Sequence, residues 1–330
     1  MNFLETILGV VGILFVSAPT KSGFSTSETT NDGTKSRSAI NLFFCEQTRV
    51  ETPKGSGEWK IVETVQKVPA TSTAILICDM WDYHPCQPAL ARCQAMAGKM
   101  NQVVASARNN GVQIIHSPSG CMEAYADTTQ RQRMIEVPHV EPPEPLDLQT
   151  PTFPLGTDTN HGCDGIWDWD HGGTQKMTRQ TPLVEIAEED GISDSGADVY
   201  NFMRQRGITK LLIMGVHTNM CVMGRSFGIQ QMVKWQVDIA LVRDLTDAMY
   251  NPADPPYVNH DKGTELMIEY IEKYWCPSIP SDCILMNSDI SNTYLGLPFP
   301  IFNLNRTIRS LAPCGRLETR IRRGQAPRLR

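Results

Sequence analysis

Apolar residues along the chain occur in two patterns, short unbroken runs and longer stretches in which they recur with a helical period. The unbroken runs predict strands buried on both sides, and the periodic stretches predict helices packed against them. The predicted strands are residues 73–78, 112–116, 210–215 and 237–242, with a short last strand over 284–286. The predicted helices are 90–110 closed by Gly111, 196–206 closed by Gly207, 219–234 and 265–275.

The alternation of these strands and helices predicts the fold class. Strands separated by helices of this length imply right-handed crossovers, and therefore an α/β fold with a mostly parallel central sheet and helices on both faces. In such sheets the functional side chains gather at the carboxyl ends of the strands. The candidate chemistry is therefore expected where the predicted strands end.

The chain divides into a predicted domain over residues 50–290 and two extensions. Residues 19–49 contain a stretch rich in Ser, Thr, Gly and Lys and are expected to be a flexible linker. Residues 291–330 carry eight arginines from Arg306 onward against the single acid Glu318. Such a basic run is typical of a solvated, disordered tail, and no nucleic-acid partner is expected for it.

The N-terminus carries an apolar run from Ile7 to Ala18, which is too short for a stable membrane span. Its length and the small residues at its end favour a signal peptide over residues 1–18 and hence export to a periplasm or to the medium. Glu5 and the lack of a preceding positive charge count against this interpretation. The alternative is a start codon placed too far upstream of a cytoplasmic protein.

Charge and cysteine content narrow the class of protein. A formal net charge of −6 gives no general attraction to nucleic acid. The ten cysteines are scattered without a CxxC pair, which is unlike a short disulfide scaffold or a zinc module. An oxidised pair elsewhere, for instance Cys276 with Cys283, stays open.

Two side chains at strand ends suggest nucleophilic catalysis. Asp79 follows the first strand, and Cys221 falls in the first turn of the predicted helix that follows the strand ending at Gly215. Unpaired N–H groups and the helix dipole at such a position would lower the pKa of the thiol. Asp79 would act as base for the thiol and later as acid for the leaving group, and the backbone amides would hold an oxyanion.

Three segments together resemble the isochorismatase-like cysteine hydrolases, which include nicotinamidases, isochorismatases and N-carbamoyl amidohydrolases. They are the strand end at Asp79, the run Gly215 to Val222 (GVHTNMCV) and the run Arg243 to Ala248 (RDLTDA), and the similarity spans roughly residues 73–277. The resemblance implies a Rossmann-like three-layer sandwich and an Asp–Lys–Cys triad with Asp79 as base and Cys221 as nucleophile. It also implies a cis peptide between Val216 and His217, with the amides of His217 and Cys221 lining an oxyanion hole.

The triad lysine is where the sequence departs from this pattern. Counted back from the helix at Gly196 and the strand at Lys210, the position falls at or near Arg179. Arginine keeps its charge at any working pH, so it could stabilise a thiolate but could not transfer a proton. Lys176 is the other candidate, and only one of the two can face the site because they lie three residues apart on an extended segment.

A second departure from the pattern of the superfamily concerns metal binding. Nicotinamidases of this superfamily hold a divalent ion with an Asp-x-His motif after the second strand, where this chain has His116-Ser117-Pro118-Ser119-Gly120 without an acid. No other pair of histidines has recognised ligand spacing, so no metal is expected, nor any organic cofactor.

Several residues are expected near the pocket without a part in the chemistry. Trp81 and His84 would line or pack its entrance. The aromatic and acidic stretch Asp164 to His171 could be a lid or a plain surface insertion. Asp244 and Asp247 are interpreted as residues that fix the loop after their strand.

The resulting functional hypothesis is a hydrolase of a small amide-like, C–N-bonded substrate, with a thioester intermediate and a homo-oligomeric assembly. Two alternatives stay open: a vinyl-ether hydrolase of the isochorismatase type, which uses Asp79 as an acid, and a catalytically inactive relative that binds a small molecule. A redox-sensing thiol is a more remote third.

Overall fold

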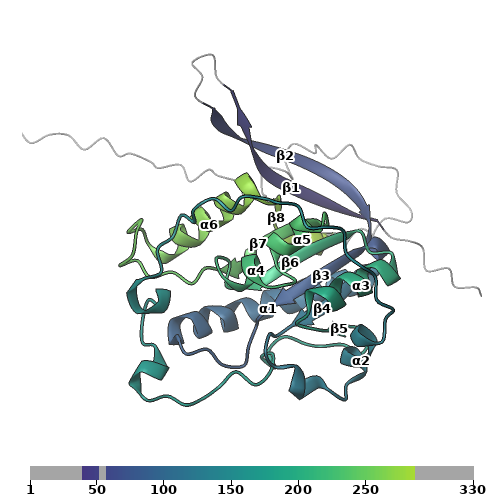
Figure 1. Cartoon of the computed structure of the whole chain (residues 1–330), viewed down its shortest axis with the longest axis horizontal. Helices are drawn as coiled ribbons and strands as arrows, with labels where there is room; N and C mark the ends of the chain where they lie inside the picture. The colour runs from purple at the N-terminus through teal and green to yellow at the C-terminus, as the bar shows by residue number, and fades with distance from the viewer. Residues whose placement is uncertain (1–38, 52–56, 287–330) are drawn as a thin grey trace, which may run out of the picture. The chain divides into compact units, whose positions relative to one another are not determined.

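The computed structural model of the protein describes residues 39–51 and 57–286, and within them it contains one eight-stranded sheet (Figure 1). The strands are β1 (Ala39–Val50), β2 (Glu58–Pro69), β3 (Thr73–Cys78), β4 (Gln113–Ser117), β5 (Gly191–Ile192), β6 (Lys210–Val216), β7 (Asp238–Asp247) and β8 (Ser278–Ile279). The α-helices are α1 (Gln87–Asn110), α2 (Thr129–Ile135), α3 (Gly196–Arg206), α4 (Cys221–Gly224), α5 (Ile229–Lys234) and α6 (His260–Tyr274). Four 3-10 turns are η1 (Ala70–Ser72), η2 (Met122–Tyr125), η3 (Thr159–Gly162) and η4 (Asp168–His171).

The strand order is β2-β1-β8-β7-β6-β3-β4-β5. The strands from β8 to β5 pair in parallel, and β1 is antiparallel to both β8 and β2. The α/β class and the mostly parallel sheet are therefore confirmed. Because β3 and β6 are neighbours and run in the same direction, their carboxyl ends, at Asp79 and after Val216, meet at one edge of the sheet.

Helices cover both faces of the sheet. On one face α1 packs Met100, Val103 and Val104 against Ile75 and Ile77 of β3. On the other face the buried side chains of α3, α5 and α6 pack against the alternate residues of the same strands: Phe202, Met232, Met267 and Ile271 lie with Leu76, Leu211, Ile213 and Leu241. Both sides of the central strands are thus buried, which accounts for their unbroken apolar sequence.

Most predicted elements are confirmed within a few residues, and two predictions are wrong. The helix expected over 219–234 is two short helices, α4 and α5, separated by a turn that runs from Arg225 to Gly228. The strand expected over 284–286 is helical, and the last strand of the sheet is instead β8, which ends before Pro280. Proline lacks the N–H that a continuing ladder requires, so the strand stops there.

The boundary of the folded region also differs from the prediction. Residues 39–49, expected to be part of a flexible linker, form most of β1 and pair along their whole length with β2. Alternate residues Ile40, Leu42 and Phe44 are buried in the same cluster as α1, and this burial holds the segment in the sheet. The signal peptide and the basic tail lie outside the described residues. Among the described helices, none combines the length and the apolar character needed to cross a membrane.

The cysteines that are paired in the structure differ from the pair suggested by the sequence. Cys276 and Cys283 form no disulfide with each other, so that suggested pair is wrong. Cys86, just before α1, is bonded to Cys163, 77 residues further along the chain, with 5.7 Å between their Cα atoms. The long irregular segment between α2 and β5 is thereby tied to the carboxyl edge of the sheet.

Candidate active site

Asp79 lies in a tight turn at the end of β3 and is fully buried. Its φ of 48° is in the left-handed region, which aspartate tolerates better than most residues. The N–H of Ser119 donates to its Oδ1 over 2.6 Å, and Nε of Arg225 donates to its Oδ2 over 3.1 Å. Both carboxyl oxygens therefore accept a hydrogen bond, an arrangement that suits the carboxylate.

The chain approaches Cys221 through a turn that starts at Gly215. This glycine has a φ of 114°, and a Cβ at its position would lie 2.0 Å from the carbonyl oxygen of Cys78, so only glycine fits. The peptide between Val216 and His217 is cis, as the resemblance implied. The turn then folds back, with the N–H of Met220 and of Val222 both donating to the carbonyl of His217, at 3.0 and 3.2 Å.

Cys221 is the first residue of α4 and is partly exposed, while the flanking Val222 and Met223 are buried. Its thiol hydrogen-bonds Asp79, and a backbone hydrogen bond from His217 reaches its sulfur. Among the described residues the N–H groups of His217 and Cys221 donate to no backbone carbonyl. Two amides without backbone acceptors thus flank the sulfur.

The cation beside this pair is Arg225, which the sequence analysis did not single out. It caps α4, where its own N–H donates to the carbonyl of Cys221 over 3.1 Å. Its guanidinium forms an ion pair with Asp79 and hydrogen-bonds Cys221, and its side chain is 41% exposed. The three side chains Asp79, Cys221 and Arg225 therefore form one contact group.

The pKa of Cys221 differs from the prediction, which expected it to be lowered. Burial and, after it, the charge of the nearby Asp79 raise the pKa of Cys221 to about 12, and Arg225 opposes both. The expected depression by a helix dipole is wrong, because α4 has only four residues. Burial also raises the pKa of Asp79, although Arg225, Cys221 and Ser119 act to lower it. The site therefore holds a buried carboxylate with a raised pKa beside a neutral thiol.

Arg179 and Lys176, the two candidates for the cationic position, lie in an exposed segment before β5. The carbonyl of Arg179 accepts from the N–H of Asp82, which pairs this segment with the turn after β3. In the part of the chain that the structure describes, no ion pair or hydrogen bond joins either side chain to Asp79 or Cys221. That contact is made by Arg225 instead.

Aromatic rings cluster beside the sulfur. Trp81 packs with Cys121 and Cys221 and stacks on His84, with ring centroids 6.3 Å apart. The His84 ring meets the edges of His217 at 4.9 Å and of Trp167 at 5.8 Å. Of the predicted entrance residues, His84 thus contacts the ring of His217 and Trp81 stacks on His84, and Trp167 of the long irregular segment joins them.

The two histidines of this cluster are uncharged at any working pH. Burial lowers the pKa of His84 to about 4 and that of His217 to about 3, and each is also disfavoured as a cation by neighbouring positive charge. The N–H of Cys86 donates to Nδ1 of His84 over 3.1 Å, so this ring carries its proton on Nε2. Nε2 of His217 is buried and has no hydrogen-bond partner among the described residues.

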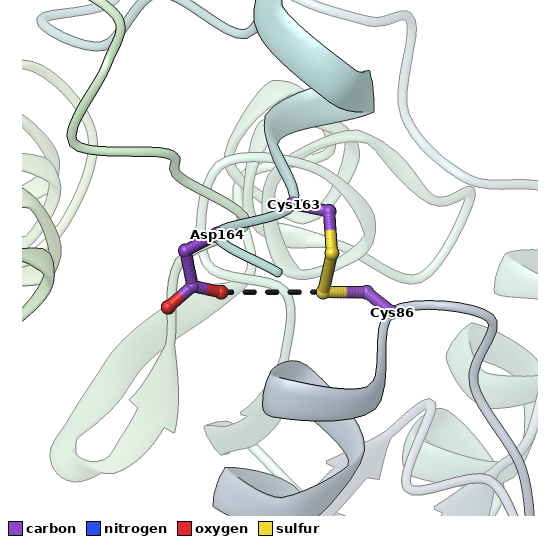
Figure 2. A group of neighbouring side chains, drawn as sticks. All are labelled: Cys86, Cys163 and Asp164. Carbon is purple, nitrogen blue, oxygen red and sulfur yellow. Dashed lines mark hydrogen bonds between the residues drawn. A yellow bond between two sulfur atoms is a disulfide. The ribbon is translucent and has the colours of Figure 1, made fainter. Parts of the chain in front are cut away.

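One group of side chains has the composition of a metal site. Cys86, Cys163 and Asp164 place two sulfurs and a carboxylate oxygen within 4.8 Å of one another (Figure 2). The two sulfurs are bonded to each other, so neither is the thiolate that a metal would need. Both oxygens of Asp164 accept from the guanidinium of Arg92, at 2.8 and 3.1 Å. The disulfide and the ion pairs to Arg92 therefore hold the segment at Cys163 and Asp164 to the start of α1.

A cysteine hydrolase and isochorismatase-family proteins are among the solved structures to which this chain is similar. A cysteine hydrolase from Pseudomonas syringae pv. phaseolicola aligns at 17% identity and a TM-score of 0.41, over 68% of this chain and 95% of its own. Isochorismatase-family proteins from Burkholderia thailandensis and Desulfovibrio vulgaris align at 14% identity each, with TM-scores of 0.37 and 0.35. They cover 66% and 64% of this chain and 96% of their own.

No protein-family model matches the sequence, and no curated protein matches it either. The chemistry of the chain is therefore inferred from its own side chains.

Arg225 could have been found from the sequence. A residue four positions after Cys221 lies on the same face of a helix as the sulfur, and the predicted helix over 219–234 would have placed it there. In the structure the helix ends at Gly224, and the turn that follows brings the guanidinium to Asp79. The disulfide had no such signal, because nothing in the spacing of Cys86 and Cys163 marks them as partners.

Proposed function

We propose that the chain is a hydrolase that cleaves a small amide-like substrate at its C–N bond, with Cys221 as nucleophile, Asp79 as acid and base and Arg225 as fixed cation. The observation that carries the proposal is the contact group of these three side chains at the carboxyl edge of the sheet. It joins a partly exposed sulfur to a fully buried carboxylate.

The first half of the reaction follows from the protonation states. Asp79 takes the proton from Cys221 as the sulfur attacks the carbonyl carbon, and Arg225 stabilises the negative charge on sulfur. The raised pKa of the carboxyl makes it a stronger base than an exposed aspartate. The amides of His217 and Cys221 donate to no backbone acceptor, and in the reaction the hydrogen bond from His217 to the sulfur would be exchanged for one to the oxyanion.

The second half restores the enzyme. Protonated Asp79 gives its proton to the leaving nitrogen, the C–N bond breaks, and a thioester remains on Cys221. A water molecule then loses a proton to Asp79 and attacks the thioester, which releases the acid and returns the thiol. Arg225 remains charged throughout, since arginine does not give up its proton in this range.

The vinyl-ether alternative is less well supported. It requires Asp79 to enter the reaction as an acid, yet both of its oxygens accept hydrogen bonds, one of them from a cation. A carboxylate satisfies both donors, and a carboxylic acid would lose one of the two acceptors. A covalent intermediate would separate the two reactions, because acid catalysis alone forms none.

The test uses p-nitrophenyl acetate as an acylating probe together with a panel of primary and N-carbamoyl amides assayed for ammonia release. We expect an acetyl group on Cys221 by mass spectrometry in the wild-type chain, and a loss of turnover of at least about 1000-fold in Cys221→Ala. The matched control is Cys121→Ala, which removes a second free thiol from the same apolar cluster. Turnover in Cys221→Ala within about tenfold of the wild type would refute the proposal.

A further inference from the structure

Arg92, in the second turn of α1, is bound to two carboxylates at once. Its Nε donates to Oδ2 of Asp247 over 2.9 Å, while Nη1 and Nη2 bind both oxygens of Asp164. Its side chain is 26% exposed, and those of Asp247 and Asp164 are 9% and 18% exposed. A guanidinium with three of its donors engaged in this way holds its partners at fixed distances from each other.

His260, at the start of α6, completes the group. Its Nε2 lies 2.9 Å from Oδ1 of Asp247, and its Nδ1 lies 2.9 Å from the carbonyl oxygen of Tyr250. Both partners can only accept, so both ring nitrogens must donate and the ring is an imidazolium. Two cations therefore face two carboxylates within the cluster.

Asp247 connects the cluster to the turn that carries the proposed nucleophile. Its backbone carbonyl accepts from the N–H of Thr218 over 2.9 Å. The hydroxyls of Thr218 and Thr246 are 2.7 Å apart, and Asn219 exchanges two hydrogen bonds with the backbone of Met249, at 2.9 and 2.8 Å. The segment between the cis peptide and Cys221 is thus fastened to the end of β7.

Asp164 connects the cluster to the segment that carries Trp167. It follows Cys163, whose disulfide to Cys86 ties this segment to the start of α1 (Figure 2). Three residues further on, Trp167 pairs with Cys86 as an isolated bridge and meets the ring of His84. The segment that carries Trp167 is therefore held both by the disulfide and by Arg92.

We propose that Arg92 is a positioning residue, which binds Asp247 and Asp164 together and so fixes the amides beside Cys221 relative to the Trp167 segment. This inference rests on the proposed function, since it concerns the placement of the oxyanion amides. Loss of the guanidinium would let the turn beside Cys221 and the Trp167 segment shift relative to each other. Placement errors of about 1 Å can reduce turnover about 100-fold.

The same helix offers a matched control. Arg108, near the other end of α1, binds Asp190 through Nε over 3.0 Å and through Nη2, and Asp190 also contacts a histidine, His116. In this second cluster Asp190 directly precedes β5 and His116 lies within β4; among the described residues no hydrogen bond or ion pair joins them to the turn at residues 217–220. Arg92→Gln and Arg108→Gln therefore remove comparable ion pairs and differ in what those pairs hold.

The experiment compares acylation of Cys221 by p-nitrophenyl acetate with its alkylation by iodoacetamide. Acylation passes through an oxyanion, and alkylation does not. We expect Arg92→Gln to slow acylation about 10- to 100-fold while alkylation changes less than about twofold. Arg108→Gln should leave both rates within about twofold, measured where each variant is folded.

Two further variants guard against a failure of Arg92→Gln to fold. Arg92→Lys keeps a positive charge but loses the planar guanidinium that binds two carboxylates at once. Asp164→Asn weakens only the contact between Arg92 and the Trp167 segment. Both variants should reduce acylation more than alkylation. Equal loss of acylation and alkylation in the Arg92 variants, or a loss no larger than in Arg108→Gln, overturns the positioning role. If wild-type Cys221 is not acylated at all, the proposed function fails, and this inference fails with it.

Discussion

The two ends of helix α1 carry similar ion-pair clusters that hold different parts of the molecule. Near its start Arg92 joins Asp247, Asp164 and His260 at the carboxyl edge of the sheet. At its last turn Arg108 binds Asp190, just before β5, and Asp190 in turn contacts His116 within β4. The chemistry of the groups is the same at both ends, and their surroundings differ.

The Arg108 cluster is buried at its centre. Asp190 is 1% exposed, and its oxygens are occupied by Arg108, by His116 and by the N–H of Ala187. The Arg92 cluster acts electrostatically on the ring of His217 and is hydrogen-bonded to the turn that leads to a partly exposed sulfur. Similar ion pairs therefore contribute to stability at one end of α1 and, in our proposal, to the placement of reacting groups at the other.

The largest effect expected from this comparison lies in the cation beside the sulfur. Arg225→Gln should reduce turnover of the probe about 100- to 1000-fold, because it removes the charge that stabilises the thiolate and orients Asp79. Since Arg225 lowers the pKa of Asp79, the acid limb of the pH–rate profile should move to higher pH.

The controls for that change are the two cations considered first from the sequence. Arg179→Gln and Lys176→Gln alter exposed side chains without a contact to Asp79 or Cys221, and each should keep turnover within about twofold. Arg225→Lys should restore part of the activity, since it returns a point charge. A large loss in Arg179→Gln with none in Arg225→Gln would show that the resemblance had identified the right cation.

The second effect concerns stability at the Arg108 cluster. Arg108→Gln leaves the buried Asp190 without its main cation and should lower the free energy of unfolding by about 3 kcal/mol. Turnover per folded molecule should stay within about twofold of the wild type. Urea unfolding followed by circular dichroism measures the first quantity, and probe hydrolysis the second. A selective loss of turnover in this variant would remove the distinction between the two clusters.

The sequence predicted most of the sheet because burial on both sides leaves an unmistakable apolar run. The strand over 73–78 and the helix over 196–206 agree with β3 and α3 residue for residue. The place of Asp79 and Cys221 at neighbouring strand ends follows from the same pattern, since parallel strands align their carboxyl ends.

What the sequence missed depends on contacts between distant segments. The helix after Cys221 breaks because its turn packs against α3, where a Cβ on Gly196 would lie 1.9 Å from the carbonyl oxygen of Ser226. No local propensity encodes that approach. The raised pKa of Cys221 likewise comes from burial, and the sequence shows only that the thiol begins a helix. Residues 39–49 resembled a linker because their buried positions alternate with half-exposed ones in a two-stranded extension.

The smallest expected effect is the pH dependence of the Arg92 cluster. Burial lowers the pKa of His260, but the hydrogen bond and the charge of Asp247 outweigh it and raise the pKa above its ordinary value. The stabilisation is therefore fully present below the unfolded value of about 6.5 and is lost as pH rises through the folded value. The facing groups stay unchanged over this range: Asp247 has a lowered pKa, Arg92 stays charged and His217 stays neutral.

This effect can be isolated with two variants that each remove one histidine. His260→Gln should cost about 2 kcal/mol in urea unfolding near pH 5.5, and the difference from the wild type should shrink toward about pH 9. His139→Gln, which removes an exposed ring paired with Glu141, is the control and should show no such trend. A constant difference between His260→Gln and the wild type across the range would mean that the ring is neutral in the folded chain. The charge balance assigned to the cluster would then be wrong.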